Sequence, residues 1–458
     1  MTMSSPHQTL NTKLLRNLVF PVGDFLFGQK MISRLKFLEA AQYWSPSQIE
    51  EQQTADFRKL IRVAYEEVPF YRQLFLEWGI RPEKNLTPAD LLRMPVVTKD
   101  RLRAAYPQNV TRSTGQKTYE VSTSGSTGKN FHVMEDALTS GNHRAAFLLA
   151  LEWAGWSIGE PQLQTGMTLK RSLDRRLKDW LLGCHYVSAY DLSDSHLDEI
   201  LNTIEKYHLK HLWGYPGSLY LIAQHAQKRG WNQPLHSVVS WGDMLYPHYR
   251  AALEKTFQTR VTDTYGCSEG FQVSAQCEFG NYHIHALDTL VEFLDEDGQP
   301  VSPGQVGSII LTRLHPGPMP LIRYQVGDLG SPSALTSCPC GRNLPMMSSL
   351  FGRNTDIIQT PSGNRLIVHF FTGVLEHFTD VESFQVIQDE LESITVLIVP
   401  TQPALPGLSQ AIIKALKDRG AADLEIKVEF VDQIPLQKTG KNRFIISSLK
   451  ASSGSSSQ

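Results

Sequence analysis

Between residues 122 and 129 the chain reads Ser122-Thr123-Ser124-Gly125-Ser126-Thr127-Gly128-Lys129. Glycines let a backbone turn tightly and present its N–H groups to an anion, and hydroxyl side chains can donate to phosphate oxygens. Only two residues separate Gly125 from Gly128, and Asn130 follows Lys129. The stretch is therefore not the P-loop of kinase-like proteins, which has four residues between its glycines and Ser or Thr after its lysine. By itself it fits a phosphate-binding loop or a solvated turn equally well.

Strands and helices alternate on the C-terminal side of this loop. Ser195 and Asp198 have the spacing of a capping box, which predicts a helix that ends near Tyr207. The pattern continues with strands at 211–213, 237–240 and 260–264 and with helices at 216–230 and 247–257. Alternation at these lengths predicts an α/β fold with a parallel sheet covered by helices. The first hundred residues are expected to be mainly helical, with an interruption at Pro69.

The C-terminal part of the chain has two further patterns. From about residue 288 short alternating segments are joined by turns, which predicts a β-rich region. Beyond residue 352, strands at 381–387, 393–399 and 425–431 and a helix at 410–417 predict a small α+β domain. We therefore expect an N-terminal domain over 1–351 with its β-rich region at about 288–351, and a small domain over 352–448. The serine-rich tail, 449–458, is expected to be disordered.

Composition and charge restrict the class of protein. The chain has 458 residues, enough for two or more domains, and a net charge of −2, so nucleic acid is not a favoured partner. The most apolar early run, Leu18 to Phe27, is short and is broken by Pro21 and Asp24, so no transmembrane segment is predicted. This run is expected to dock on the body of the protein, with a membrane surface as the alternative. Five cysteines without a signal peptide indicate a reducing, cytoplasmic location.

Further motifs, at characteristic distances along the chain, indicate that the loop binds phosphate. They read Asp263-Thr264-Tyr265-Gly266-Cys267-Ser268-Glu269, Arg323-Tyr324-Gln325-Val326-Gly327-Asp328, Gly352-Arg353-Asn354-Thr355-Asp356 and Thr439-Gly440-Lys441-Asn442-Arg443. Together with the loop, they resemble the ordered signatures of the adenylate-forming enzymes, the superfamily of acyl-CoA synthetases, peptide-synthetase adenylation domains and luciferases. Three more segments, Val68-Pro69-Phe70-Tyr71-Arg72, Gly214-Tyr215-Pro216 and Cys338-Pro339-Cys340-Gly341-Arg342, resemble the phenylacetate–CoA ligase and CapK-like branch.

The resemblance implies a fold, an activity and residue roles. It covers all but about thirty N-terminal residues and the tail, and it implies that the small C-terminal domain is mobile. Residues Ser124 to Lys129 would hold the β- and γ-phosphates of ATP, Glu269 a Mg²⁺ ion, and Lys441 the developing charge between the acyl carboxylate and the α-phosphate. Arg353 would contact ribose or phosphate. The remaining nucleotide contacts are expected from Gly242, Asp243, Asp263, Tyr265, Gly266, Ser268 and Asp328, and the acid pocket from Trp213, Tyr215 and Trp241, with Gly266 beside them.

Four residues have the spacing and chemistry of a zinc site. Cys277 and His283, followed by Cys338 and Cys340, supply thiolates and an imidazole, the ligands that zinc prefers in tetrahedral structural sites. The second pair resembles the metal knuckle of the same branch. His285 is a rival ligand because it lies two residues from His283. Buried free cysteines beside a surface histidine are the alternative interpretation.

Three functions follow from these patterns. The first is an acid–CoA ligase that uses ATP and Mg²⁺ to convert a small carboxylic acid, by default an aryl acid, to acyl-AMP and then passes the acyl group to CoA. The second keeps the adenylation step but transfers the acyl group to an amine or a sugar hydroxyl. The third is a nucleotide-binding homologue without catalysis. A homodimer is left open.

Overall fold

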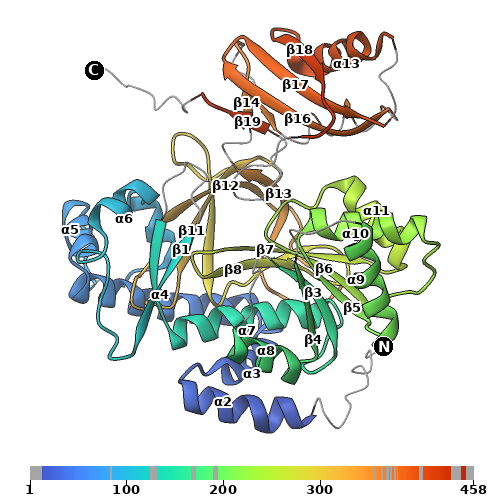
Figure 1. The fold of residues 1–458 in the computed structure, drawn as a ribbon. Coiled ribbons are helices and arrows are strands. Elements are labelled where there is room, and N and C mark those ends of the chain that lie inside the picture. The colour runs from blue at the N-terminus through green and yellow to red at the C-terminus, as the bar shows by residue number, and fades with distance from the viewer. Residues whose placement is uncertain are drawn as a thin grey trace. The chain divides into compact units, whose positions relative to one another are not determined.

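The computed structural model describes residues 13–82, 85–123, 131–166, 172–188, 194–353, 357–362, 365–367, 371, 374–375, 378, 380–401, 406–434 and 445–449. By their internal contacts the residues form two compact units (Figure 1). The larger unit comprises Met1–Val326 and Gly330–Ser349, and the smaller comprises Gly327–Leu329 and Leu350–Gln458. No helix among the described residues is long and apolar enough to cross a bilayer.

An eleven-stranded sheet organises the larger unit, in the order β10-β11-β12-β13-β9-β8-β7-β6-β5-β3-β4. One half is parallel, as predicted, and consists of β3 (Gln162–Gly166), β4 (Cys184–Ser188), β5 (His211–Gly214), β6 (Ser237–Ser240) and β7 (Val261–Cys267). The remaining strands are β8 (Phe271–Gln276), β9 (Tyr282–Ile284), β10 (Thr289–Leu294), β11 (Gly307–Arg313), β12 (Tyr324–Pro332) and β13 (Met346–Arg353). The pairs β7–β8, β8–β9, β10–β11 and β13–β9 are antiparallel.

Two antiparallel strands lie before residue 288, where the sequence predicts the β-rich region to start. The sequence of β8, Phe271-Gln272-Val273-Ser274-Ala275-Gln276, alternates apolar and polar residues, and all of them are buried. The alternation that is typical of a strand is therefore present in the sequence before residue 288.

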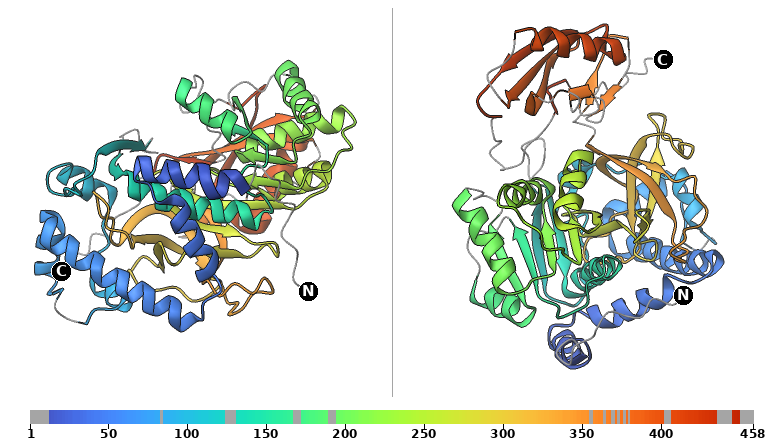
Figure 2. Two further views of the ribbon diagram at one scale, coloured as in Figure 1. Left: turned by 90° about the horizontal axis from the view of Figure 1, so that it is seen from below. Right: turned by 90° about the vertical axis from the view of Figure 1, so that its right-hand side faces the viewer.

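Helices cover the parallel half of the sheet on both sides (Figure 2). Helices α9 (Asp194–Lys206), α10 (Pro216–Lys228) and α11 (Pro247–Phe257) pack on one face, where Leu212, Val238 and Val261 join their apolar side chains in one core. The helix α8 (Leu173–Leu181) contacts the edge strand β4. The helix α7 (Ala137–Trp153) contacts β8 and begins at Asp136, whose carboxylate accepts from the Thr139 N–H at 2.8 Å.

The N-terminal region is helical, as predicted. It contains a π-helical turn (Leu15–Val19), α2 (Phe20–Phe27), α3 (Met31–Ala41), α4 (Pro46–Glu67), α5 (Pro69–Glu77), a 3₁₀ turn (Pro88–Arg93) and α6 (Lys99–Ala105), followed by the hairpin of β1 (Thr118–Thr123) and β2 (Phe131–Asp136). Ser45 and Gln48 form a capping box at the start of α4. Pro69 separates α4 from α5, because a proline cannot continue the helix that precedes it.

The smaller unit has the α+β pattern that the sequence predicts. Its strands β18 (Glu425–Phe430), β17 (Ser393–Pro400), β16 (Val381–Glu390) and β19 (Ile445–Ser447) form one sheet in that order. The short strands β14 (Ile357–Gln359) and β15 (Arg365–Ile367) pair with each other. Helix α13 (Leu408–Leu416), followed by a π-helical turn (Lys417–Ala421), contacts β18, and Ile412 and Leu416 are fully buried.

Candidate functional site

The turn between β7 and β8 carries a buried carboxylate. Glu269 is only 3% exposed, and the following Gly270 adopts a positive φ of 81° that favours glycine. The Oε1 atom of Glu269 lies 3.1 Å from Lys99 Nζ and accepts a hydrogen bond of 2.8 Å from the Tyr324 hydroxyl. Burial by itself would raise the pKa of Glu269, but Lys99 and the Tyr324 hydroxyl outweigh it and hold that pKa below its usual value. The site therefore contains an ionised carboxylate away from bulk water.

This contact joins two sequence motifs that are separated by more than fifty residues. Glu269 ends the Asp263-to-Glu269 motif, and Tyr324 belongs to the Arg323-to-Asp328 motif. Arg323, the neighbour of Tyr324, is buried and bonds Glu292 at 3.0 Å, which fixes the start of β12. The tertiary structure thus positions the Tyr324 hydroxyl precisely at the Glu269 carboxylate.

Sequence reasoning missed Lys99. This residue starts α6, after Thr98, whose hydroxyl accepts from the Arg101 N–H at 3.4 Å. It lies 170 positions before its partner Glu269. Nothing local in the sequence distinguishes Lys99 from an ordinary surface lysine, so only the tertiary contact identifies it.

Asp263 is held by protein groups at the ends of β6 and β7. Its Oδ1 accepts from Ser240 Oγ at 2.7 Å, and its Oδ2 accepts from the Tyr282 hydroxyl. Burial raises the pKa of Asp263, against the hydrogen bonds from Tyr282 and Ser240. Both carboxylate oxygens are engaged, so Asp263 supports the strand ends, and a nucleotide contact by this residue stays a prediction.

The residues predicted for the acid pocket form an aromatic group at the ends of β5 and β6. The Trp213 ring lies 5.0 Å from Trp156 and 6.4 Å from Trp241, and Trp241 lies 5.5 Å from Phe147 of α7. The Trp213 side chain is buried, and its Nε1–H has no acceptor among the described residues. This wall suits an apolar or aromatic group.

Glycine allows the adjoining backbone to approach an aromatic ring. A Cβ on Gly242 would lie 2.7 Å from Tyr215 Cε1, and Gly242 has a positive φ of 76°. Gly242 and Asp243 are exposed beside this ring.

Three further predicted nucleotide contacts lie at the end of β7, on the same edge of the sheet. Tyr265 is buried, Gly266 is half-buried and Ser268 is exposed. The structure therefore places these predicted nucleotide contacts at the carboxyl ends of parallel strands, where α/β proteins bind ligands.

For the remaining predicted site residues, the structure describes no contact with the aromatic group or with Glu269. Ser124 to Lys129 and Lys441 lie outside the described residues. Arg353 is the last residue of β13, and its side chain is likewise outside the description. Asp328 is half-buried on β12 and belongs to the smaller unit. Their roles remain predictions from the motifs.

A small cavity with several polar side chains in its lining borders Gly270. Its lining includes Asn142 and His143 of α7, Gln272 and Arg313, and its volume of about 20 Å³ has room for about one water molecule. Arg313 is 4% exposed, and its Nε and Nη1 have no hydrogen-bond partner among the described residues. An internal water molecule would satisfy these donors.

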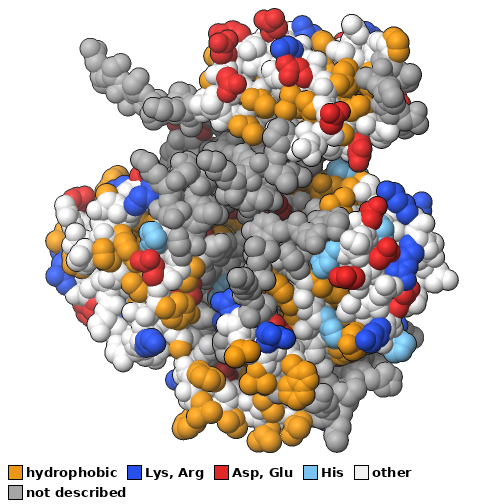
Figure 3. Space-filling model, viewed as in Figure 1, with side chains coloured by type: hydrophobic (Ala, Val, Ile, Leu, Met, Phe, Trp, Pro, Cys, Tyr) orange, Lys and Arg blue, Asp and Glu red, His pale blue; other side chains and the backbone are white. Residues whose placement is uncertain are grey.

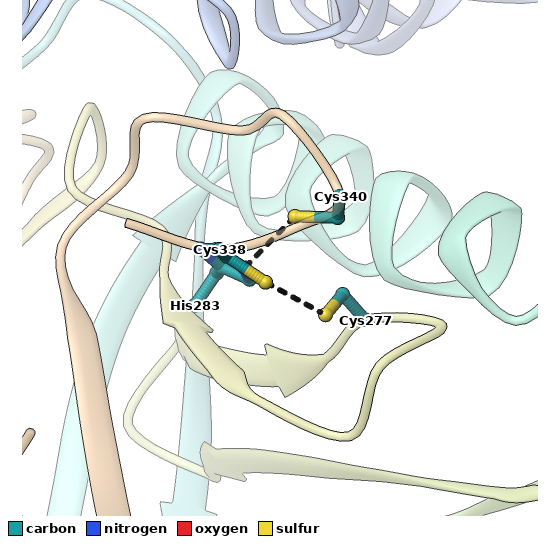
Figure 4. Close-up of side chains that lie close together, drawn as sticks. All are labelled: Cys277, His283, Cys338 and Cys340. Atoms are coloured by element: carbon teal, nitrogen blue, oxygen red, sulfur yellow. Dashed lines mark hydrogen bonds between the residues drawn. The ribbon is translucent and has the colours of Figure 1, made fainter. Parts of the chain in front are cut away.

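A cluster of three cysteines and one histidine lies at the opposite end of β8 (Figure 4). Cys277 follows β8, His283 lies on β9, and Cys338 and Cys340 come from the loop before β13. One ligand atom from each of the four lies within 4.8 Å of the others. The Sγ atoms of Cys277 and Cys338 are 3.7 Å apart, and Cys340 Sγ is 3.2 Å from His283 Nε2. Bond lengths of zinc to sulfur and nitrogen require donors about 3.5–3.8 Å apart in a tetrahedron, so this donor set fits zinc.

Surrounding groups orient these donors. His283 Nδ1 lies 3.2 Å from the Leu344 carbonyl, which directs Nε2 toward the cysteines. The Asn281 amide donates to Cys338 Sγ at 3.2 Å. The rival ligand His285 is outside the cluster, since its ring stacks on Trp153 at 5.1 Å and 16°. The tertiary structure thus selects His283 from the two candidates.

Arg342 connects the cysteine loop to the N-terminal helices. Its guanidinium bonds Glu278 at 2.7 Å and the Gln42 amide oxygen at 2.9 Å, and it lies 5.0 Å from the Trp153 ring. Gln42 also accepts from Trp153 Nε1 at 2.9 Å. These contacts tie the cysteine loop to the C-terminal end of α3 and to α7.

Known proteins resemble this chain over almost its whole length. Phenylacetate-coenzyme A ligase of Thermus thermophilus is 25% identical over 428 residues, which cover 85% of this chain and 94% of the relative. Protein CapK of Staphylococcus aureus is 22% identical over 454 residues, which cover 95% of this chain and 98% of the relative. A family model described as the CapK C-terminal domain matches residues 358–448.

A solved structure shows the same fold. 2-Hydroxyisobutyryl-CoA ligase, in the postadenylation state in complex with R3-HIB-AMP, aligns with a TM-score of 0.73 and 18% identity. The alignment covers 89% of this chain and 91% of that chain. The likeness therefore extends through both compact units.

Proposed function

We propose that the chain is an adenylate-forming enzyme of the branch of the phenylacetate–CoA ligases and CapK, which it resembles, and that it activates a carboxylic acid with ATP and transfers the acyl group to CoA. The observation that carries this proposal is the similarity to phenylacetate-coenzyme A ligase through 94% of that relative's length. The buried, ionised Glu269 supports it, because a hard cation such as Mg²⁺ prefers carboxylate oxygens.

Adenylation brings two anions together, so positioning and charge neutralisation dominate its catalysis. Glu269 would hold Mg²⁺, which neutralises the triphosphate when bound. Lys99 is the cation next to Glu269 and is 28% exposed, so it can face an incoming phosphate. Tyr324 fixes the Glu269 carboxylate by its hydrogen bond. Lys441 would supply the charge between the acyl carboxylate and the α-phosphate, and Ser124 to Lys129 would hold the outer phosphates.

The acid is proposed to be an aryl acid. The aromatic group of Trp213, Trp241 and Phe147 offers flat apolar surface next to the predicted nucleotide contacts. Because Gly242 has no side chain, the Tyr215 ring can pack against the backbone at the same edge of the sheet. We place the reaction in the cytoplasm, which supplies ATP and CoA and keeps the five cysteines reduced.

We further propose that Cys277, His283, Cys338 and Cys340 hold one structural zinc ion. Four protein donors fill a tetrahedron and leave no position for substrate, which is typical of structural rather than catalytic zinc. The ion would join β8, β9 and the loop before β13, and so stabilise the antiparallel half of the sheet.

The test is pyrophosphate release that depends on an added carboxylic acid, measured over a panel of aryl and aliphatic acids with and without CoA. We expect one class of acid to support release and CoA to accelerate turnover. Lys441→Ala should abolish adenylate formation but spare ATP binding. Lys427→Ala is the matched control, because Lys427 is an exposed lysine on β18 of the same unit, and it should behave as the parent. Normal adenylate formation in Lys441→Ala would contradict the assignment.

A second candidate keeps the adenylation step and changes the acceptor. The match of residues 358–448 to the CapK C-terminal domain favours it, because the C-terminal domain is the part that the family resemblance links to the second half-reaction. In that case an acid releases pyrophosphate but CoA leaves the rate unchanged, and amines and sugar hydroxyls become the acceptors to test. Failure of every acid would favour the non-catalytic homologue.

A further inference from the structure

The N-terminal segment exposes its apolar side chains. Not one residue of α2 is buried, and Phe25, Leu26 and Phe27 are 87%, 69% and 71% exposed. Leu14, Leu18 and Val22 are also at least half exposed. We call these six side chains the apolar N-terminal face. Figure 3 shows hydrophobic side chains gathered over α2 at the bottom of the view. An exposed patch of this kind on a single chain marks an interaction surface.

The segment is attached to the body through polar and backbone contacts and through the buried side chain of Leu15. Arg16 bonds Glu39 of α3 and lies 3.4 Å from Glu152 of α7. The Asp24 carboxylate accepts from the Ile32 N–H at 2.6 Å. The Gln29 carbonyl lies where a Cβ on Gly141 of α7 would be, at 2.0 Å, so backbone packs directly on backbone. A helix that merely docks buries its apolar side, whereas this one is held by its polar side and points its apolar side outward.

Exposed lysines lie on both sides of this apolar face in the sequence. Lys13 precedes it, and Lys30 and Lys36 follow it, all exposed. The nearby carboxylates of Asp24 and Glu39 are occupied by the contacts just described. The surface therefore combines apolar side chains with positive charge.

Helix α8 repeats the combination on the same lower side of the unit (Figures 1 and 2). Leu173, Leu177 and Trp180 recur at helical spacing and are 82%, 58% and 76% exposed. Arg175 and Arg176 are exposed between them.

We propose that the apolar N-terminal face docks on a membrane surface that contains anionic lipids. Amphipathic helices lie in the plane of the interface, with aromatic and leucine side chains among the acyl chains and lysine or arginine at the headgroups. Each basic residue near an anionic leaflet adds to the attraction. A second copy of the chain fits less well, because a two-fold interface would bring the same cations together. The enzyme would thus rest on the membrane without crossing it.

Vesicle flotation of the full-length protein tests the proposal. We expect the protein to float with vesicles that contain phosphatidylglycerol and to float less with vesicles of phosphatidylcholine alone. The double variant Phe25→Gln/Phe27→Gln should lose about a hundredfold in partitioning, since each buried aromatic ring contributes about tenfold or more. The matched control is Leu76→Gln/Trp78→Gln, an equally spaced pair of exposed apolar residues at the end of α5, and should float as the parent does.

Two results would overturn the proposal. One is a parent protein that floats with neither kind of vesicle. The other is a Phe25→Gln/Phe27→Gln variant that floats as well as the parent. If light scattering shows a dimer that this variant converts to a monomer, with no flotation of either, the face is instead an interface between copies. Pyrophosphate release that depends on an added carboxylic acid should be equal in parent and variant, which shows that both proteins are folded. Flotation itself is measured without an acid, so its outcome does not depend on which acid the protein activates.

Discussion

Replacing Cys338 by serine removes one donor from the proposed zinc site. The cluster places its donors 3.2–3.7 Å apart in the two closest pairs and all four within 4.8 Å. Zinc needs separations of about 3.5–3.8 Å, so the ion binds after shifts of only about 1 Å or less. Such a preorganised site should hold close to one zinc per chain, and Cys338→Ser should hold far less.

The thermal effect can be worked out from the size of the larger unit. Metal held at a hundred times its dissociation constant stabilises the folded state by about 2.7 kcal/mol. A unit of about 350 residues unfolds with an entropy of about 0.7 kcal/mol per degree, so the expected rise in Tm is about 4 °C. A strong chelator should lower the Tm of the parent by that amount and leave Cys338→Ser unchanged.

Elemental analysis and thermal scans with and without chelator make the measurement. Cys184→Ser is the matched control, because Cys184 is a half-buried cysteine outside the cluster, and it should retain both zinc and the chelator response. Parent protein without zinc after expression in zinc-supplemented medium, or with a Tm that ignores the chelator, would refute the reasoning. Equal zinc content in parent and Cys338→Ser would refute the choice of ligands.

Three further predictions concern charge at buried carboxylates. Glu269→Gln should lower adenylate formation by about a hundredfold, measured as pyrophosphate release, because the proposed metal ligand loses its charge; an undiminished rate would remove Glu269 from the site. Lys99→Met should raise the pKa of Glu269 and move the acid limb of the pH–rate profile to higher pH, whereas Arg101→Met, two residues along α6, should not. Asp288 is buried, and although burial opposes it, Arg34 at 2.8 Å and His315 at 2.9 Å hold its pKa well below the usual range. A carboxylate whose pKa is lower in the folded state than in the unfolded state stabilises the protein above the unfolded-state pKa, and this stability is lost as the pH falls toward the folded-state pKa. Asp288→Asn should therefore lower the free energy of unfolding by about 3 kcal/mol near neutral pH. Denaturant titrations should also show a flatter dependence of stability on pH on the acid side.

The sequence by itself determined the fold class and the resemblance to the adenylate-forming enzymes. Strand and helix alternation between 195 and 264 is local, and the structure has the predicted elements at nearly the same bounds. The motifs are also short runs, so their order and spacing can be read without coordinates. The small α+β domain after residue 352 follows for the same reason. The domain limits, its mobility and the residue roles at Lys441, Asp328 and the phosphate loop stay predictions.

Only the tertiary structure decided which distant groups meet. It paired Lys99 with Glu269, chose His283 over His285 beside the cysteines, and engaged both oxygens of Asp263 with Ser240 and Tyr282. It also turned the apolar side of α2 outward, although apolar residues in a helix usually predict burial. Periodicity reports the neighbours of a residue along the chain, whereas a buried ion pair or a metal cluster depends on which elements pack together. That packing is fixed by the sheet order and the helices on it, and no local pattern of residues contains it.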